Sequence, residues 1–334
     1  MSYTRRQFLE SASALGAASL LGYSRTAVAE SPPETRRIRF VDSPSICGAP
    51  MYLAEELLRL EGFSQIEYFQ RPVGMTRTTA LSERKSDIDV EDAQMVVAGI
   101  DRGHDVIALG GVHAGCYELF AHEDIETIRD LKGRTIVILG FGRADHVFLS
   151  VLAAYIGMDP SKDFKWLTAG TLKNALRIFK DRGADAFLAF PPHPQQLRAE
   201  KIGRVILDTT RDRPWSQYFC CILIGNREFV AKHPIATKRA MRAILKAADI
   251  CSQDPQRVAH FLVAKGHVPK YEIALEVLQS IPYRFWREQD PEDSLRFHAL
   301  RLREVGMIKS SPQKIIAQGT DWRTFNELKK ELKA

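Results

Sequence analysis

The chain has 334 residues, of which 45% are hydrophobic and 26% are charged, and its formal net charge is +6. This is the composition of a globular protein, and the length favours more than one hydrophobic core. The basic residues are scattered and are not clustered among aromatic residues, which excludes nucleic acid as a partner.

The first 29 residues have the organisation of an export signal. Arg5 and Arg6 precede an apolar run over 11–22, and the Ala-Val-Ala of 27–29 is a small-residue cleavage site. The run is too short to span a membrane. With Phe8 and Leu9, the arginine pair resembles the twin-arginine motif, so we expect contact with the Tat translocon, cleavage after Ala29 and a periplasmic protein. The alternative is an ordinary Sec signal whose arginines happen to be adjacent.

The rest of the chain alternates between predicted strands and helices. Apolar and β-branched runs predict strands at 37–41, 66–69, 88–90, 106–110, 117–121, 135–139, 165–167, 185–190, 204–208 and 219–224. Periodic apolar residues with capping signals predict helices at 50–61, 76–86, 92–101, 127–132, 147–156, 172–182, 234–253, 255–265, 271–279, 291–305, 311–316 and 325–333. This alternation indicates an α/β fold with mainly parallel sheets.

Two series of strand–helix units, followed by a lone strand and helices, predict two lobes joined by a double crossover. The expected parts are the signal at 1–29, the first lobe at 30–116, the second lobe at 117–219, and a return strand with C-terminal helices at 220–334. Ligands of open α/β sheets bind beyond the carboxyl ends of the strands, so we expect a cleft between the lobes.

Six short phrases, in their order and spacing, resemble one family of binding proteins. These are residues 49–56, 86–90, 127–136, 183–187, 224–229 and 232–234. They are similar to the SsuA/THI5-like (NMT1-like) periplasmic proteins for nitrate, sulfonates, taurine and thiamine precursors. The resemblance implies a type II periplasmic-binding fold that carries out no chemistry. It also implies delivery of a small molecule to an ABC permease with its cytoplasmic ATPase.

The loop over 140–146 departs from the family's Gly-Ser pattern and is the main candidate for ligand binding. It leads from a predicted strand into a helix N-terminus, where free N–H groups favour an anion and Arg143 adds a clamp. The alternative is a plain turn with a solvated arginine. A dinucleotide site is disfavoured, because Asp145 occupies the third glycine position. The candidates in this loop are Gly140, Phe141, Gly142, Arg143 and His146.

Further candidates follow other strands. The loop before the first helix offers Ser45, Cys47 and Gly48, and the next strand is followed by Met75, where the alternative is simple capping by Thr76. Glu91 and Asp92 end an acidic strand whose spacing is not that of a calcium loop. His113, at the expected crossover, is either a hinge residue or a ligand contact. Aromatic residues that can close over an apolar ligand body are Phe190, Trp215 and Tyr218.

Five cysteines, an odd number, lack any CxxC or zinc spacing, so we expect no metal and mostly buried thiols, with one disulfide possible. Cys220 and Cys221 are adjacent and are expected on opposite faces of a strand. No catalytic motif or cofactor signature is found, and a monomeric binder is expected. The alternatives are a module that serves a sensor kinase and, less favoured, a THI5-like enzyme.

Overall fold

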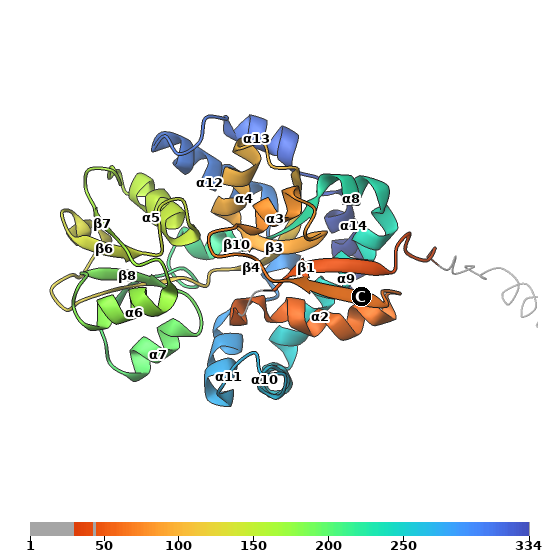
Figure 1. Ribbon diagram of the computed structural model, residues 1–334, viewed down its shortest axis with the longest axis horizontal. Helices are drawn as coiled ribbons and strands as arrows, with labels where there is room; N and C mark the ends of the chain where they lie inside the picture. The colour runs from red at the N-terminus through yellow and green to blue at the C-terminus, as the bar shows by residue number, and fades with distance from the viewer. Residues whose placement is uncertain (1–29, 43–44, 334) are drawn as a thin grey trace, which may run out of the picture. The chain divides into compact units, whose positions relative to one another are not determined.

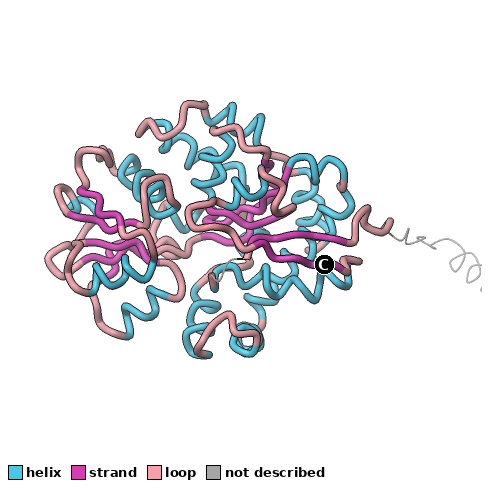
Figure 2. Tube along the Cα trace, viewed as in Figure 1, coloured by secondary structure: helices cyan, strands magenta, loops and turns pink. Residues whose placement is uncertain are grey.

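The computed structural model describes residues 30–42 and 45–333. Residue contacts divide the chain into Met1–Pro32 and Pro33–Ala334, and the elements below all belong to the second unit. Figure 1 shows its helices and strands, and Figure 2 shows that the strands gather in separate sheets with helices around them. The predicted export signal lies outside the described residues and stays a prediction.

The first elements form a parallel strand–helix–strand unit. β1 (Arg37–Val41) pairs with β2 (Gln65–Phe69), and α2 (Ala49–Leu60) connects them after the short η1 (Ile46–Gly48). Pro50 lies in the first turn of α2, where its missing N–H is not needed. The helix ends before Gly62, whose φ of +102° is a conformation that favours glycine.

The second group is a three-stranded sheet in the order β3–β10–β4. β10 (Phe219–Asn226) is the central strand and runs antiparallel to both β3 (Ile88–Asp92) and β4 (Val106–Ala114). Its helices are α3 (Arg77–Ser82) and α4 (Ala93–Asp101). β1 is tied to β3 by two buried carboxylates, because Asp87 accepts from the Arg39 N–H at 2.8 Å and Asp89 accepts from the Val41 N–H at 2.6 Å.

The third group is a five-stranded sheet in the order β7–β6–β8–β5–β9. Its strands are β5 (Glu118–Ala121), β6 (Thr135–Ile138), β7 (Lys165–Thr168), β8 (Ala186–Ala189) and β9 (Arg204–Asp208). Its helices are η2 (Ile128–Leu131), α5 (Ala144–Tyr155), α6 (Leu172–Lys180), α7 (His193–Ala199) and η3 (Trp215–Gln217). A small apolar core that includes Phe120, Phe179 and Phe187 fills one side of this sheet.

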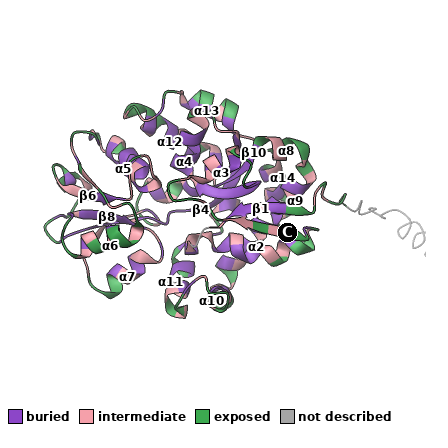
Figure 3. Cartoon of the chain, in the orientation of Figure 1, coloured by how far each residue is buried: buried purple, intermediate pink, exposed green. Residues whose placement is uncertain are grey.

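The chain after β10 is helical. It forms α8 (Arg227–Lys232), α9 (Pro234–Gln253), α10 (Pro255–Ala264), α11 (Tyr271–Ser280), η4 (Phe285–Arg287), α12 (Pro291–Glu304), α13 (Pro312–Gly319) and α14 (Arg323–Glu331). α9 packs on α2, and α12 packs on α4 and α5. Figure 3 shows β4, β8 and β10 buried, whereas many residues of the helices and loops are exposed.

The α/β prediction is confirmed, with differences in detail. β1 and β2 pair in parallel, the three-stranded sheet is antiparallel and the five-stranded sheet is mixed. The antiparallel pairs arise because β5 and β10, the first strand after each crossover, run opposite to their neighbours. α5 begins at Ala144, three residues before the predicted start, and α7 and α8 were not predicted. The short segments of α7 and α8 follow strand ends and lack a long apolar period. None of the helices in the described ranges is long and apolar enough to cross a membrane.

Candidate ligand-binding site

A cavity of about 470 Å³ lies where the three-stranded and five-stranded sheets face each other. This volume is within the range of about 300–1,000 Å³ typical of small-molecule pockets. The three-stranded sheet and its helices contribute Asp89, Glu91, Asp92 and Cys221, and the opposite side contributes Tyr117 and the loop from Leu139 to Asp145. Strand ends and the loops that follow them therefore form this site, as is usual for open α/β sheets.

Ten of the fifteen predicted residues line the cavity. They are Ser45, Cys47, Gly48, Met75, Glu91, Asp92, Phe141, Gly142, Arg143 and Phe190. These residues come from five separate segments of the chain, and each segment lies at or just beyond the end of a strand, or at the start of the helix that follows it. Met75 lines the cavity while the neighbouring Thr76 caps α3 by accepting from the Thr79 N–H at 3.0 Å. Thr76 thus caps α3 as one interpretation of this segment expected, and the role of Met75 in ligand binding stays a prediction.

Three further predicted residues lie behind the cavity wall and do not line it. Gly140 lies between Leu139 and Phe141, which line the cavity, but does not line it itself. His146 lies on α5, where its Nδ1 accepts from the Gly142 N–H at 3.1 Å. The His146 ring also contacts Phe141 and Trp166 edge-on. Because α5 begins at Ala144, His146 is a helical residue that supports the loop. His113 is completely buried on β4.

The two remaining aromatic residues belong to a separate group, which we call the aromatic cluster. Trp215 contacts Phe148, Tyr155 and Phe297 with ring centroids 5.1–5.6 Å apart, and Tyr218 stacks on Phe297 at 4.3 Å. The aromatic cluster consists of Phe148, Tyr155, Trp215, Tyr218 and Phe297. The prediction that Trp215 and Tyr218 close over the ligand is not supported by this geometry, because their rings are used in packing with α5 and α12.

Three arginines and two aspartates that line the cavity were not predicted, namely Arg71, Arg77, Arg102, Asp89 and Asp145. Arg77 starts α3 and contacts Asp89 at 3.4 Å and Glu91 at 3.2 Å, and its backbone N–H donates to Glu91 at 3.0 Å. Arg71 follows β2, and its guanidinium donates to the Met75 carbonyl oxygen. The sequence signal was the Arg-x5-Arg spacing between a strand end and a capped helix, although only the tertiary structure brings both arginines to the acidic strand β3.

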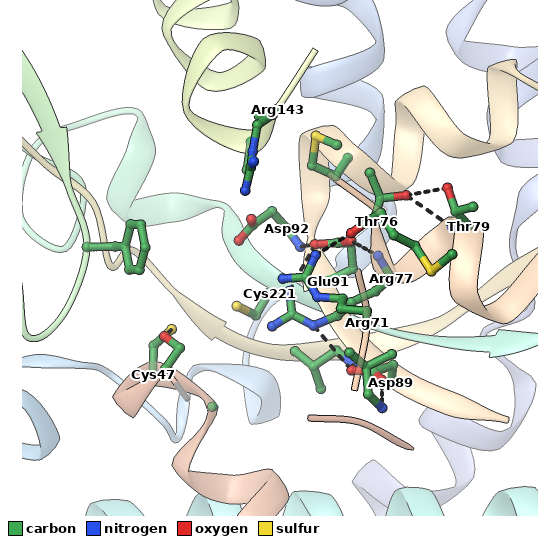
Figure 4. A pocket seen from close by; sticks show the side chains of 18 of the residues that line it. Cys47, Arg71, Thr76, Arg77, Thr79, Asp89, Glu91, Asp92, Arg143 and Cys221 are labelled. Carbon is green, nitrogen blue, oxygen red and sulfur yellow. Dashed lines mark hydrogen bonds and ion pairs between the residues drawn. The ribbon is translucent and has the colours of Figure 1, made fainter. Parts of the chain in front are cut away.

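Arg143 has a different environment from Arg77. Figure 4 shows its side chain extending into the space faced by Asp92, Cys47 and Cys221. The guanidinium of Arg143 makes no hydrogen bond or ion pair with the residues that the structure describes. Burial, reinforced by the nearby charges of Arg77 and Arg143, lowers the pKa of Arg71. The cavity thus brings arginines from both sides close together, an arrangement that favours a negatively charged ligand.

The acidic residues of the cavity carry less negative charge than their number suggests. Burial raises the pKa of Asp89 to about 6, although Arg77 opposes this effect. Burial also raises the pKa of Asp92 to about 8, with the neighbouring Cys221 and Glu91 adding to the shift. Asp92 is therefore mostly protonated at neutral pH, and it opposes an anionic ligand less than an ionised carboxylate would.

The loop that carries Arg143 is held by hydrogen bonds to α5. The Asp145 carboxylate, in the first turn of the helix, accepts from the Leu139 N–H at 2.5 Å, and burial raises the pKa of this carboxyl group. Gly142 has a φ of +73°, which permits the turn between Phe141 and Arg143. Phe141 is 66% exposed and Phe190 is partly buried, so these two rings provide apolar surface at the cavity.

The cysteines come together although they are far apart in the sequence. Cys47, Cys116 and Cys221 line the cavity, and the Sγ atoms of Cys116 and Cys220 are 3.0 Å apart. All five cysteines of the chain are free thiols, and four of them are buried. The sequence lacks a metal-ligand spacing, yet the fold brings these cysteines close together in space.

Comparison with solved structures shows that the fold is that of periplasmic binding proteins. The nitrate-binding protein NrtA of Synechocystis PCC 6803 matches with a TM-score of 0.75 and 15% identity, covering 91% of this chain and 90% of that one. The alkanesulfonate-binding protein SsuA of Xanthomonas axonopodis pv. citri, solved with MOPS bound, gives 0.70 and 15%, covering 83% and 96%. SsuA of Escherichia coli, an aliphatic sulphonate-binding protein, gives 0.67 and 16%, covering 87% and 94%.

The family follows from the sequence itself. Residues 61–258 match the family model described as NMT1/THI5 like, which is more than half of the chain. The protein therefore belongs to the NMT1/THI5-like family, as the six phrases indicated. No curated protein matches the chain.

Proposed function

We propose that this protein is the extracytoplasmic solute-binding subunit of an ABC importer and that it binds a small organic anion in the cavity. The observation that carries the proposal is Arg143. Its guanidinium extends into a cavity of ligand size and makes no hydrogen bond or ion pair with the described residues. A guanidinium in this position can bind a carboxylate, sulfonate or phosphate with two hydrogen bonds.

The membership of the family and the nature of the solved neighbours support a transport role. The neighbours named above bind nitrate or sulfonates. Within this proposal, residues 30–116 and 220–334 form one lobe and residues 117–219 the other. The lobes close over the ligand, which requires that the closed state binds it more tightly than the open state. The proposed partners are a membrane permease and its ATPase, and the protein acts as a monomer without catalysis.

A thermal-shift screen tests the proposal directly. The panel contains sulfonates, carboxylates, nitrate and pyrimidines, and at least one anion is expected to raise the melting temperature, because a ligand that binds only the folded state stabilises it. If no compound in the panel shifts melting and protein purified from cells carries no small molecule, the binder proposal is wrong.

The role of Arg143 is tested with the best anion from that screen. Arg143→Ala is expected to weaken binding by about 1.5–3 kcal/mol, or about 10- to 150-fold, because a charge-assisted hydrogen bond is lost. Arg143→Lys retains the positive charge but cannot donate two parallel hydrogen bonds. Its affinity for the anion is therefore expected to lie between those of the wild type and Arg143→Ala. Arg129→Ala removes an exposed arginine of η2 outside the cavity and serves as the matched control. Equal affinity of Arg143→Ala and Arg129→Ala, measured by calorimetry, would exclude the role.

The two alternative classes are separated by simple observations. A module that serves a sensor kinase binds the same ligand but stimulates a receptor in place of uptake, so a transport assay in cells lacking the protein distinguishes it. An enzyme of the THI5-like kind converts its ligand, so recovery of chemically unchanged ligand after prolonged incubation opposes that function.

A further inference from the structure

Three segments that are distant in the sequence place soft metal-binding atoms next to one another. Cys47 lies on η1, His113 on β4 and Cys221 on β10, and one donor atom from each lies within 4.8 Å of the other two. Cys47 is held in place because the buried Tyr283 hydroxyl donates to the carbonyl oxygens of Ile46 and Cys47 at 3.2 and 3.4 Å. We call Cys47, His113, Cys116, Cys220 and Cys221 the cysteine cluster.

The cluster depends on an irregularity in β10. In a regular strand Cys220 and Cys221 would point to opposite faces, as the sequence predicted. The pairing of β10 with β4 shifts on both sides of Cys221, and the donor atoms of Cys220, Cys221 and Asp92 lie within 4.8 Å of one another. The prediction of opposite faces is therefore wrong, because a β-bulge redirects side chains locally.

His113 has the hydrogen bonds of a metal-binding histidine. Its Nδ1 lies 3.2 Å from the carbonyl oxygens of Ala114 and Gly115, and carbonyl oxygens only accept, so Nδ1 carries the proton. Its Nε2 is fully buried and has no hydrogen-bond partner among the described residues. A ring fixed through one nitrogen by backbone carbonyls presents the lone pair of the other nitrogen, which is the usual arrangement in metal sites.

The sulfur atoms of Cys47 and Cys221 are the soft donors of this group, and each thiol releases its proton when it binds a metal. The thiolate is the form of cysteine that binds metals. Cys47 and Cys221 both line the cavity, so an ion reaches them through it.

We propose that Cys47, His113 and Cys221 bind a thiophilic metal ion, of the class of Zn²⁺ or Cu⁺, with an open coordination position facing the cavity. Two thiolates and one imidazole suit these ions, and three protein ligands with an open fourth position are found in zinc sites that bind a further molecule. Each coordinating thiol releases its proton to the solvent, and no oxidant or reductant is required.

A second donor set competes for the same sulfur atom. Asp92 and Cys220 also approach Cys221, with the Cys220 Sγ 4.0 Å from the Asp92 carboxylate. Because Cys221 belongs to both sets, only one of them is filled at a time. We favour the set with His113. This set contains a buried imidazole nitrogen, Nε2 of His113, that has no hydrogen-bond partner among the described residues, whereas the other set contains no histidine. The proposal does not depend on the import function.

The test is a metal titration of the full chain after reduction with a phosphine and removal of the reductant without oxygen. Co²⁺ is the spectroscopic probe, and one equivalent is expected to produce a thiolate-to-cobalt charge-transfer band. Zn²⁺ is then expected to displace it, and its affinity is measured by competition with a chromophoric chelator. Copper is tested as Cu⁺ with a Cu⁺-selective chelator in the same protein.

Five variants locate the site, and the fifth, Cys220→Ser, tests the competing donor set. Cys47→Ser and Cys221→Ser are each expected to weaken the charge-transfer band and to lower Zn²⁺ affinity by more than the ~10–100-fold typical of losing a residue that only orients a ligand. Cys116→Ser removes a cluster thiol outside the donor set and prevents a Cys116–Cys220 disulfide, so it is expected to retain the band. Cys251→Ser removes a buried cysteine outside the cluster and is the control for folding.

The outcomes separate the alternatives. Absence of a charge-transfer band in the reduced wild-type protein, or an unchanged band in Cys47→Ser, overturns the proposal. Loss of binding in Cys220→Ser but not in Cys47→Ser would place the metal in the competing set and also overturn it. Cys47 is only partly buried, so Cys47→Ser is expected to fold. The proposal can therefore be tested with Cys47→Ser even if Cys221→Ser does not fold. Anion binding in the thermal-shift screen is a separate readout of the import function.

Discussion

The cavity and the aromatic cluster meet at Tyr117, yet they are built in different ways. Tyr117 lines the cavity and its ring lies 4.9 Å from that of Phe148. On the cavity side the neighbouring groups are arginines, carboxylates and thiols around about 470 Å³ of space, whereas the pocket beside Trp215 and Tyr218 holds only about 20 Å³. Both regions contain residues that the sequence marked as ligand contacts. Trp215 and Tyr218 lie close to a crossover in the sequence, yet neither lines the cavity. Their rings pack instead on the apolar surface formed by the aromatic residues of α5 and α12.

The largest expected effect separates the two regions by stability. Trp215→Ala removes a buried ring from contact with three aromatic neighbours and is expected to lower the free energy of unfolding by about 3–5 kcal/mol. The affinity for the anion found by the screen is expected to stay the same, since Trp215 does not line the cavity. Urea denaturation and calorimetry measure the two quantities. A variant of normal stability with impaired binding would restore Trp215 as a ligand contact.

A smaller effect concerns pH and arises beside the aromatic cluster, at His298. Burial lowers the pKa of His298 from 6.5 to about 3, and its Nδ1 has no hydrogen-bond partner among the described residues. Between these two pKa values the unfolded chain binds one more proton than the folded chain. Neutral His298 therefore does not reduce the free energy of unfolding above pH 6.5. Below pH 6.5 this free energy falls by about 1.4 kcal/mol per pH unit as the pH decreases towards 3.

His298→Leu is the variant that isolates this effect. Its free energy of unfolding, compared with that of the wild type from pH 7 to pH 4.5, is expected to show a shallower decrease. His260→Leu replaces an exposed histidine of α10 whose ring stacks on that of Tyr271, and it serves as the control variant. Parallel curves for His298→Leu and the wild type would show that His298 does not resist protonation.

The smallest effect concerns the loop that carries Arg143. Gly142→Ala is expected to cost about 1–2 kcal/mol of stability, because a residue with a side chain is strained at a φ of +73° although the nearest atom to its Cβ is 3.9 Å away. Gly140→Ala is the matched control, since Gly140 has no positive φ and its Cβ would meet only the flexible Arg143 side chain at 3.3 Å. Equal denaturation midpoints for the two variants would show that the left-handed turn is not needed.

The fold was largely predictable because its signals are local. The strand β1 and the helices α9 and α12 follow from alternation, apolar periodicity and proline at the helix start, and the structure places them within one residue of the prediction. Helix α8 and the start of α5 were missed. A six-residue helix has no period to detect, and the N-cap of α5, Arg143, makes no side-chain capping hydrogen bond that the sequence could signal.

The site was predictable in part, for the same reason. The residues at strand ends, such as Arg143, Glu91 and Phe190, were found because parallel strands of an α/β sheet direct their ends to one edge. Arg71 and Arg77 were missed, because a sequence does not show which carboxylates an arginine will reach. His146 was predicted in the loop because the predicted start of α5 was three residues too late. The structure places it on α5, where its ring accepts a hydrogen bond from the Gly142 N–H of the loop.

The sequence by itself determined the family, the alternation of strands and helices, and the loop that offers an unpaired arginine, because these features depend on residues that are close in the chain. Only the tertiary structure decided that Cys47, His113 and Cys221 meet, and that Trp215 packs away from the cavity. The physical reason is that these contacts join residues at least 60 positions apart in the chain and depend on the tertiary packing of strands and helices. The irregular pairing of β10 with β4 changes the direction of a side chain that regular alternation would have placed on the other face.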